Sequence, residues 1–329
     1  MKILFSSDYH PIIHLPSGDY GGHHLTFSRR ASDWGKSGLK KRWHHVIESI
    51  KVMREARDYD VLILSSVGIE AFFVGRWKGF FCPHTPVVCF DFLMPSDERF
   101  LRFTRRWLRG IDHFVCLRVG DIATFKRRFG ILTRKCSFVH FPIDAQNQAA
   151  TEDEGYIYSA GVAHRDWEML IKALSTLPYS ALLSFDGDFA IPEHAQNRIT
   201  ILPAQNTEDG RRLLQKARLV VMPLRDTFLP SGPLVLLDAM SMSKPTVVTD
   251  VNGTRDYVSD GETALVVPPG DSEAMAGAIQ KLMEDDALRH KIARQAREDV
   301  CKRFTVENFL DKILPVCEKV AAAKRRYSQ

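Results

Sequence analysis

Short apolar runs recur along the chain, and longer segments with apolar side chains at helical spacing separate them. The runs have the length and the β-branched content of buried strands. In the first half we expect strands at Lys2–Ser7, Val61–Ser65, Pro86–Phe90, His113–Leu117 and Cys136–Phe141. In the second half we expect them at Tyr156–Ser159, Ala181–Phe185, Ile199–Leu202, Leu219–Met222, Thr246–Thr249 and Val266–Pro268. Strands that alternate with helices predict α/β domains with parallel sheets.

The segments between the strands predict helices at Leu39–Arg57, from about Asp166, after Pro233, at Ser272–Met283, from Ala287 and at Asn308–Lys324. A polar segment with turn-forming residues, HPIIHLPSGDYGGHH, follows the first strand and is predicted to be a loop. A chain of 329 residues fits about two domains, and the acidic stretch ATEDEG reads as a linker between them. We therefore expect one domain over residues 1–148, a second over 149–305, and a C-terminal helix over 306–329.

The two halves of the chain differ in charge. Residues 1–150 carry 23 Lys or Arg against 14 Asp or Glu, whereas the remaining residues carry 22 against 26. A basic first half favours an anionic partner, either nucleic acid or an anionic membrane surface. Its basic residues are not interleaved with aromatic ones in a nucleic-acid-binding motif, so we expect no nucleic acid.

The remaining composition is ordinary for a globular protein. No uninterrupted apolar run approaches the ~18 to 20 residues that a membrane-spanning helix needs. The opening residues, MKILFSSD, are expected to be a core strand and not a signal peptide, because polar residues follow at once. The six cysteines form no CxxC pair, and we expect reduced thiols in a cytosolic protein.

The stretch from Leu219 to Asp250 combines a strand, a loop, a helix and a second strand. Ser231 and Gly232 can cap the helix, and Pro233 suits its first position. A helix N-terminus at the carboxyl end of a parallel strand offers unpaired amides and a positive dipole to a phosphate. Asp238, further along the helix, either accepts hydrogen bonds from a ribose or is a simple surface acid.

This stretch resembles the nucleotide-sugar site of retaining glycosyltransferases with the GT-B fold, the group 1 or family 4-like enzymes. Their pattern ends in an acidic residue followed by Ala-Met, then Lys-Pro and a strand, and Asp238-Ala239-Met240 and Lys244-Pro245 match it. The similarity continues through Asn252-Gly253, Asp256-Tyr257-Val258, Asp260-Gly261 and Val267-Pro268-Pro269-Gly270-Asp271. It covers residues 156–305 well and the first half in outline. It implies two Rossmann-like domains that face each other across a cleft, with a C-terminal helix that crosses back to the first domain.

The resemblance also implies a set of donor-binding residues. Gly21 and Gly22 follow the first strand, where the family has a glycine turn near the donor diphosphate, although two glycines also fit a flexible loop. Arg165 stands where the family usually has a Lys that contacts the diphosphate, and a guanidinium can replace it. Backbone amides near Ser231 and Gly232 would add to this site. The residues implied for the nucleoside are Pro203, Leu234 and Asp238.

The sequence departs from the family pattern near the sugar. Pro230 stands where the family's first Glu contacts the sugar, and Asp226 on the same loop can supply a carboxylate in its place. The family's cleft histidine is absent from VVCFDFLMP, where Asp91 can orient the acceptor hydroxyl as a weak base. The expected catalytic residues are therefore Asp91 and Asp226. The alternative is an inactive nucleotide-sugar-binding protein of the same fold.

Two clusters suggest a metal, a group of histidines and an Asp-x-Asp pair that can hold a metal against a diphosphate, but another role is favoured for each. His10, His14, His23 and His24 share the loop after the first strand, yet no Cys or acidic partner recurs at ligand spacing. The Asp186-Gly187-Asp188 segment is expected to be a strand-end turn. We therefore expect no metal and no cofactor, with the nucleoside diphosphate sugar as a substrate. The resemblance implies a retaining, front-face transfer in which the leaving diphosphate is stabilised electrostatically and no protein nucleophile acts.

One predicted helix has a strongly basic face and an apolar face on the opposite side. The basic residues are Arg99, Arg102, Arg105, Arg106 and Arg109. They form either a solvated face of a helix that packs on the sheet, or a surface that docks on anionic lipid. Nearby residues that would help such docking are Trp77, Lys78, Phe80 and Phe81. The resemblance implies a glycosyltransferase, more narrowly a hexosyltransferase. With this basic surface, we expect it to act at the cytoplasmic membrane face on a lipid-linked or glycolipid acceptor.

Overall fold

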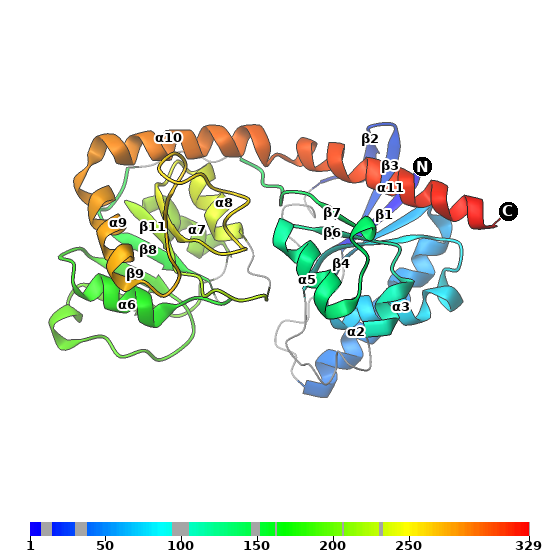
Figure 1. Cartoon of the computed structure of the whole chain (residues 1–329), viewed down its shortest axis with the longest axis horizontal. Helices are drawn as coiled ribbons and strands as arrows, with labels where there is room; N and C mark the ends of the chain where they lie inside the picture. The colour runs from blue at the N-terminus through cyan, green and yellow to red at the C-terminus, as the bar shows by residue number, and fades with distance from the viewer. Residues whose placement is uncertain are drawn as a thin grey trace. The chain divides into compact units, whose positions relative to one another are not determined.

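The computed structural model describes residues 1–7, 15–29, 38–93, 105–145, 152–161, 163–205, 207–229 and 233–328. The protein divides into two compact units (Figure 1). Unit 1 comprises Met1–Pro142 and Val306–Gln329, and unit 2 comprises Ile143–Thr305. The first unit therefore ends at Pro142 and not at residue 148, and the C-terminal segment belongs to it. Unit 2 begins and ends at neighbouring points, because the Ile143 amide donates a hydrogen bond of 2.8 Å to the Phe304 carbonyl.

Unit 1 is built on a seven-stranded sheet in the order β2-β3-β1-β4-β5-β6-β7. Its strands are β1 (Lys2–Ser7), β2 (Gly18–Tyr20), β3 (His23–Arg29), β4 (Val61–Val67), β5 (Val87–Leu93), β6 (His113–Cys116) and β7 (Cys136–Phe138). All neighbours are parallel except β2 and β3, which are antiparallel. The apolar runs of the sequence thus correspond to the central strands, as the α/β prediction requires.

Helices cover both faces of this sheet. They are α2 (Gly38–Glu55), α3 (Ile69–Phe81), α5 (Val119–Phe129) and α11 (Val306–Ser328), with short 3-10 helices η1 (Ala56–Asp58), η2 (Arg105–Gly110) and η3 (Thr133–Lys135). One face holds an aromatic core in which the Phe92 ring lies 5.5–5.9 Å from four other phenylalanine rings. On the other face, the Phe309 ring of α11 lies 5.3 Å from Phe90 and 6.3 Å from Phe5. The C-terminal helix therefore completes the core of unit 1.

The segment predicted as a loop after the first strand contains a β-hairpin. β2 and β3 are joined by Gly21 and Gly22, whose φ angles of 53° and 77° fit a tight hairpin turn that favours glycine. β3 alternates polar and apolar side chains, with Leu25 fully buried, and pairs with β1 in parallel register. The prediction of a loop was wrong because the polar positions of β3, the second strand from the edge, concealed its period of two.

The predicted arginine-rich helix is only partly within the described residues. Arg99 and Arg102 lie outside them, and Arg105, Arg106 and Arg109 lie on η2. η2 runs so close to α3 that a Cβ on Gly110 would overlap the backbone of Gly75, and one on Gly75 would overlap the Trp107 carbonyl. The described part is thus a tight 3-10 turn wedged against α3, with all three arginine side chains exposed.

Unit 2 contains a six-stranded parallel sheet in the order β10-β9-β8-β11-β12-β13. The strands are β8 (Ile157–Ala160), β9 (Ala181–Ser184), β10 (Ile199–Leu202), β11 (Leu219–Met222), β12 (Thr246–Thr249) and β13 (Leu265–Val267). Each matches a predicted strand to within a residue or two. The order reverses between β8 and β11, so the sheet has a topological switch point at the carboxyl ends of these two strands.

The helices of unit 2 are α6 (Trp167–Ser175), α7 (Thr207–Lys216), α8 (Leu234–Ser241), α9 (Ser272–Glu284) and α10 (Asp286–Arg303), with a 3-10 helix η4 (Glu193–Ala195). Aspartates cap three of them: Asp166, Asp271 and Asp285 accept hydrogen bonds from first-turn amides. Apolar clusters lie on both sides of the sheet, α6 and α9 on one side and α7 and α8 on the other. Among the described residues of both units, no helix is both long enough and apolar enough to cross a bilayer.

Candidate functional site

The switch point of unit 2 is closed by the segment that links β8 to α6. Gly161 follows β8 with a φ of +115°, and His164 also has a positive φ of 54°. The Asp166 amide donates to the Pro223 carbonyl at 2.6 Å, and the Arg225 amide donates to the His164 carbonyl at 2.9 Å. The chain after β8 is therefore fastened to the chain after β11. Crevices at such points are where open α/β sheets bind their ligands.

Arg165 lies at the centre of this junction and is buried, with 7% of its surface exposed. Its Nε donates to the Ala160 carbonyl at 2.9 Å and its Nη1 to the Ala163 carbonyl at 3.2 Å. Within the described part of the chain no carboxylate pairs with it, and Nη2 makes no hydrogen bond. Burial lowers the pKa of Arg165 to about 10, so the group is still charged at neutral pH. A buried cation without a counter-ion is costly unless a ligand supplies the anion.

Gly161 makes room for this guanidinium. A Cβ at residue 161 would lie 2.6 Å from Nη2 of Arg165, and the positive φ would strain any other residue. The glycine and the arginine therefore form one local arrangement, in which the unpaired Nη2 lies next to a backbone without a side chain. An anion can approach such a backbone closely.

Asp238 lies on α8 in an ion pair with Arg211 of α7, 2.9 Å from Oδ1 to Nη2. Its side chain is 18% exposed, and its Oδ2 makes no hydrogen bond within the described residues. Burial raises the pKa of Asp238 to about 6, although the positive charge of Arg211 opposes this rise. Sequence reasoning missed Arg211 because it did not predict α7, which is short and polar and contains Gly210.

This geometry gives a pH-dependent test of the ribose contact. Because the pKa of Asp238 is raised, the carboxylate that accepts ribose hydroxyls is lost as the pH falls through about 6. We expect nucleoside affinity to fall about tenfold between pH 7.5 and pH 5. Asp238→Asn should reduce affinity at pH 7.5 by about tenfold or more and remove the pH dependence, as measured by titration calorimetry. Unchanged nucleoside binding in this variant would show that Asp238 is only a surface acid held by Arg211.

The predicted base-binding loop lies at the carboxyl end of β10. Its backbone is held from the neighbouring strand, because Ala204 N donates to Asp186 Oδ1 at 3.0 Å and Gln205 N donates to Ser184 Oγ at 3.2 Å. Pro203 is exposed on this loop. Asp186 is thus engaged in a turn, as expected from its place after β9. On α8, Leu234 is 37% exposed and lies one turn before Asp238.

The loop after β11 carries the remaining predicted donor residues. Asp226 is exposed there, within electrostatic range of Arg255, whose guanidinium pairs with Asp250 at 2.7 Å. Ser231 and Gly232 lie outside the described residues, as does Pro230. The structure therefore places Asp226 on the carboxyl side of the sheet together with Arg165 and Asp238, all in unit 2.

Asp91 is not placed as a free base. It lies in β5 with a φ of 46° and is 4% exposed. Its Oδ1 accepts a hydrogen bond of 3.2 Å from Nη2 of Arg118, and the same guanidinium lies 2.7 Å from Asp121. All three side chains are buried. A carboxylate held by a buried arginine suits a structural role at the end of β5, and the catalytic role of Asp91 stays a prediction.

Gly21 and Gly22 lie at the wrong edge of their sheet for a donor site. Since Lys2 of β1 pairs with His24 of β3, the hairpin turn lies beside the amino end of β1, not its carboxyl end. A Cβ on Gly21 would lie 3.1 Å from the Leu314 side chain of α11. The turn packs against the C-terminal helix, so its glycines serve the hairpin and we no longer assign them to the diphosphate.

Each of the two described histidines in this hairpin pairs with a different acidic side chain. His23 lies 3.0 Å from Glu318, and His24 lies 2.9 Å from Asp19. His10 and His14 are outside the described residues. Over the part of the chain that the structure describes, no group of three or more His, Cys, Asp or Glu side chains could hold a metal ion.

Comparisons with known proteins agree with this arrangement. The family model "Glycosyl transferases group 1" matches residues 188–299. The lipopolysaccharide core biosynthesis glycosyltransferase LpsE of Rhizobium meliloti is 32% identical over 248 residues, which cover 68% of this chain and 71% of LpsE. The α-D-kanosaminyltransferase of Streptomyces kanamyceticus is 30% identical over 38% of this chain and 32% of its own. The chain spans about a third or less of the length of several such relatives.

Solved structures resemble the whole chain. HepE of Anabaena in complex with UDP gives a TM-score of 0.73 at 17% identity, over 97% of this chain and 100% of HepE. Sucrose-phosphate synthase of Thermosynechococcus elongatus gives 0.70 at 18% identity, over 98% and 99% of the two chains. These likenesses confirm the GT-B fold. With LpsE matched over most of its length and the family model matched across the donor half, the chain belongs to the group 1 glycosyl transferases.

Proposed function

We propose that the protein transfers a sugar, a hexose, from a nucleoside diphosphate sugar to an acceptor, with retention of anomeric configuration. The observation that carries this proposal is the buried guanidinium of Arg165, which has no carboxylate partner among the described residues and lies at the switch point of unit 2. A diphosphate supplies the missing anion. Residues that suit a nucleoside lie at the same carboxyl edge of the sheet, namely Pro203, Leu234 and Asp238.

The chemistry follows from the charge that develops on the leaving group. The bond between the anomeric carbon and the diphosphate oxygen breaks, and its electron pair stays on that oxygen. Arg165 stabilises this charge, which is the main contribution the protein makes. The acceptor hydroxyl attacks from the same face, and its proton passes to the departing oxygen. No protein nucleophile and no metal take part. Asp226 contacts the sugar. Backbone amides near Ser231 and Gly232 contact the diphosphate.

For the acceptor we propose a lipid-linked glycan or a glycolipid, reached at the cytoplasmic face of a membrane. Two features of unit 1 support this. The arginines of η2 are exposed, and Trp77 and Phe80 on the neighbouring α3 are 41% and 73% exposed. The relative LpsE is named for lipopolysaccharide core biosynthesis, and lipopolysaccharide is a glycolipid.

A panel of UDP, GDP, ADP and dTDP sugars tests the donor class. UDP-glucose comes first, because HepE has been solved with it. A matching donor at ~100 times its dissociation constant should add about 2.7 kcal/mol to the free energy of unfolding and raise the melting temperature. The free sugars and the bare phosphates are controls. If none of the nucleotides stabilises the protein, the proposal is wrong.

Pro230 favours a second candidate, an inactive protein that binds nucleotide sugars. It stands where the family's sugar-contacting Glu is expected, and a proline side chain cannot accept a hydrogen bond. Incubation with the donor that stabilises the protein separates the two candidates. Slow release of free sugar and nucleoside diphosphate indicates an enzyme, whereas donor binding without any turnover indicates the inactive protein.

A further inference from the structure

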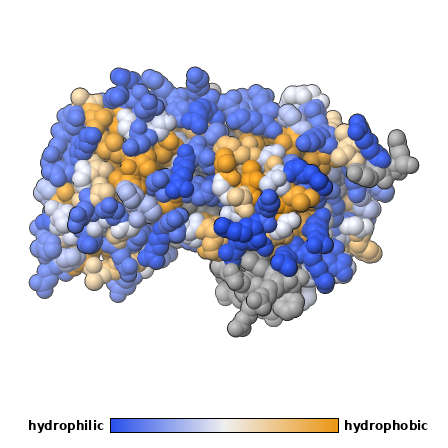
Figure 2. Space-filling model, in the orientation of Figure 1, coloured by the Kyte–Doolittle hydropathy of each residue, from blue (hydrophilic) through white to orange (hydrophobic). Residues whose placement is uncertain are grey.

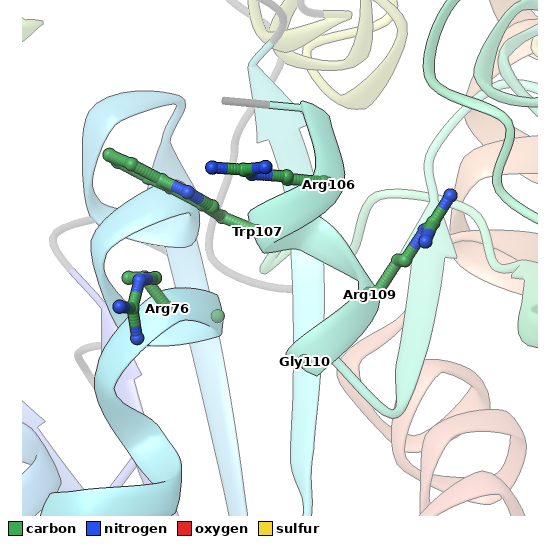
Figure 3. A pocket seen from close by; sticks show the side chains of 6 residues that line it. Arg76, Arg106, Trp107, Arg109 and Gly110 are labelled. Carbon is green, nitrogen blue, oxygen red and sulfur yellow. The ribbon is translucent and has the colours of Figure 1, made fainter. Parts of the chain in front are cut away.

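A shallow cavity of about 370 Å³ lies on unit 1 where η2 crosses α3. It is lined by Gly75, Arg76, Arg106, Trp107, Arg109 and Gly110. In Figure 3 the guanidinium of Arg106 lies on one side of the Trp107 ring and Arg76 on the other, while Arg109 points away from the ring. The cavity therefore brings cations from two elements to one aromatic wall.

A second cavity of about 280 Å³ shares Arg106 and Arg109 with the first. It adds Arg105 from η2, Arg127 and Phe129 from α5, and Gly130. We call the two together the arginine cavity, with Arg76, Arg105, Arg106, Arg109 and Arg127 as its cations. Among the residues that the structure describes, no acidic side chain lines either part. The surface thus concentrates positive charge from three separate elements.

None of these five guanidinium groups pairs with a carboxylate within the described residues. Exposed arginines elsewhere do find acids: Arg255 pairs with Asp250 at 2.7 Å, and Arg303 pairs with Asp299 at 2.8 Å. Arg76 has an aromatic partner instead, since its guanidinium carbon lies 4.8 Å from the centre of the Trp77 ring. Like charges gathered without acids repel each other, and a bound anion removes that repulsion.

The backbone beneath the cavity is fixed by a close contact between η2 and α3. Gly75 and Gly110 approach so closely that neither position has space for a Cβ. Leu108, on the inner side of η2, is buried in the core of unit 1. The spacing between the backbone of Arg76 and the backbone of the η2 arginines is therefore fixed by packing. A planar guanidinium matches the oxygens of a phosphate bidentately, so several of them on neighbouring, rigid backbone suit phosphate.

The residues around the cavity indicate which kind of molecule carries the phosphate. Trp77 and Phe80, on the same helix as Arg76, are among the large apolar side chains most exposed to solvent. Figure 2 shows hydrophobic and strongly hydrophilic residues side by side on the visible face of unit 1. Aromatic side chains next to arginines are typical of surfaces that rest in the headgroup region of a bilayer.

We propose that the arginine cavity is a phosphate-binding site that holds the headgroup phosphates of anionic phospholipids, with Trp77 and Phe80 entering the interface. Phospholipid binding is a separate activity from sugar transfer. It rests on the proposed function only in one respect, namely that a membrane-bound protein can reach an acceptor that is anchored in the membrane. The residues are all in unit 1, whereas Arg165 and Asp238 are in unit 2. Loss of lipid binding and loss of donor binding can therefore be measured separately.

The test is co-sedimentation of the full chain with phosphatidylglycerol or phosphatidylcholine vesicles. The wild type should bind phosphatidylglycerol at low salt, bind phosphatidylcholine weakly, and dissociate as salt rises, because surface charges are screened over ~8 to 10 Å near physiological salt. Combined Arg76→Gln, Arg106→Gln and Arg109→Gln should reduce partitioning on the order of 100-fold. The control variant carries Lys281→Gln, Lys291→Gln and Arg294→Gln, which remove the same charge from exposed positions of α9 and α10.

Soluble pyrophosphate distinguishes a shaped site from general charge attraction. At millimolar concentration it should displace the wild type from the vesicles, at constant ionic strength set with NaCl. Equal loss of vesicle binding in the cavity and control variants would overturn the site, and so would a wild type that ignores both phosphatidylglycerol and pyrophosphate. Binding of pyrophosphate without vesicle binding would overturn the proposal that the bound phosphates belong to phospholipid headgroups. Stabilisation of the cavity variant by the donor sugar shows that it is folded and that donor binding stands independently.

Discussion

Replacing Arg165 by Ala is expected to weaken binding of the nucleoside diphosphate by roughly 1.5–3 kcal/mol, because a charge-assisted contact to the diphosphate is lost. Binding of the bare nucleoside should change far less, since it has no group for Arg165 to pair with. Titration calorimetry with both ligands gives the two values. The guanidinium also fastens the carbonyls of Ala160 and Ala163, so the melting temperature of the variant has to be recorded alongside.

Arg225→Ala is the matched control for this experiment. Arg225 lies close by, but its side chain is 52% exposed and only 3.7 Å contacts link it to Asp166 and Glu168. Its removal should cost well under 1 kcal/mol for either ligand. An equal loss of diphosphate and nucleoside binding in Arg165→Ala would mean that the residue shapes the loop and does not contact the diphosphate.

Replacing Arg118 by Leu should lower the free energy of unfolding by about 3–5 kcal/mol, the largest effect on stability expected here. The change leaves the buried carboxylates of Asp91 and Asp121 without the cation between them, and their side chains are only 4% and 1% exposed. Urea unfolding followed by circular dichroism measures the loss.

A second variant separates the charge effect from the packing effect. Adding Asp91→Asn and Asp121→Asn to Arg118→Leu removes the two buried negative charges and should restore part of the lost stability. The surface pair of Arg212 and Glu208 is the comparison, since both side chains are well exposed and Arg212→Leu should cost about 0–1 kcal/mol. If Arg118→Leu is as mild as Arg212→Leu, Asp91 is not held by its ion pair and its assignment as a base has to be reconsidered.

Much of the fold could be predicted from the sequence, because buried parallel strands are nearly continuous apolar runs. All six strands of unit 2 appear where such runs stand. Several elements were missed. α3 and α5 were not predicted although they bury Phe72 and Phe125, and two other missed elements have few buried side chains. β3 is an edge-side strand whose pattern is mixed with polar residues, and α7 contains Gly210 and buries little beyond Leu214.

The candidate site was predictable only where it depends on local sequence. Arg165 comes a few residues after a strand and a glycine, so its place at the carboxyl edge could be expected. Gly21 and Gly22 also follow a strand. The sequence does not show, however, that the chain returns to the amino end of β1 before it makes the hairpin turn at these glycines. The partner of Asp91 comes from the end of a different strand, and no spacing rule links Asp91 to Arg118.

The close approach of Ile143 and Phe304 has a consequence for engineering. The donor half is one uninterrupted piece of chain whose two ends meet, whereas the other half is assembled from both termini, with Phe309 filling its core. A chimera that imports a relative's nucleotide specificity therefore needs only two crossovers, close together in space. Conversely, a fragment that stops at Pro142 would expose the apolar surface around Phe5 and Phe90 to water, and supplying the last helix as a separate peptide would be needed to cover it.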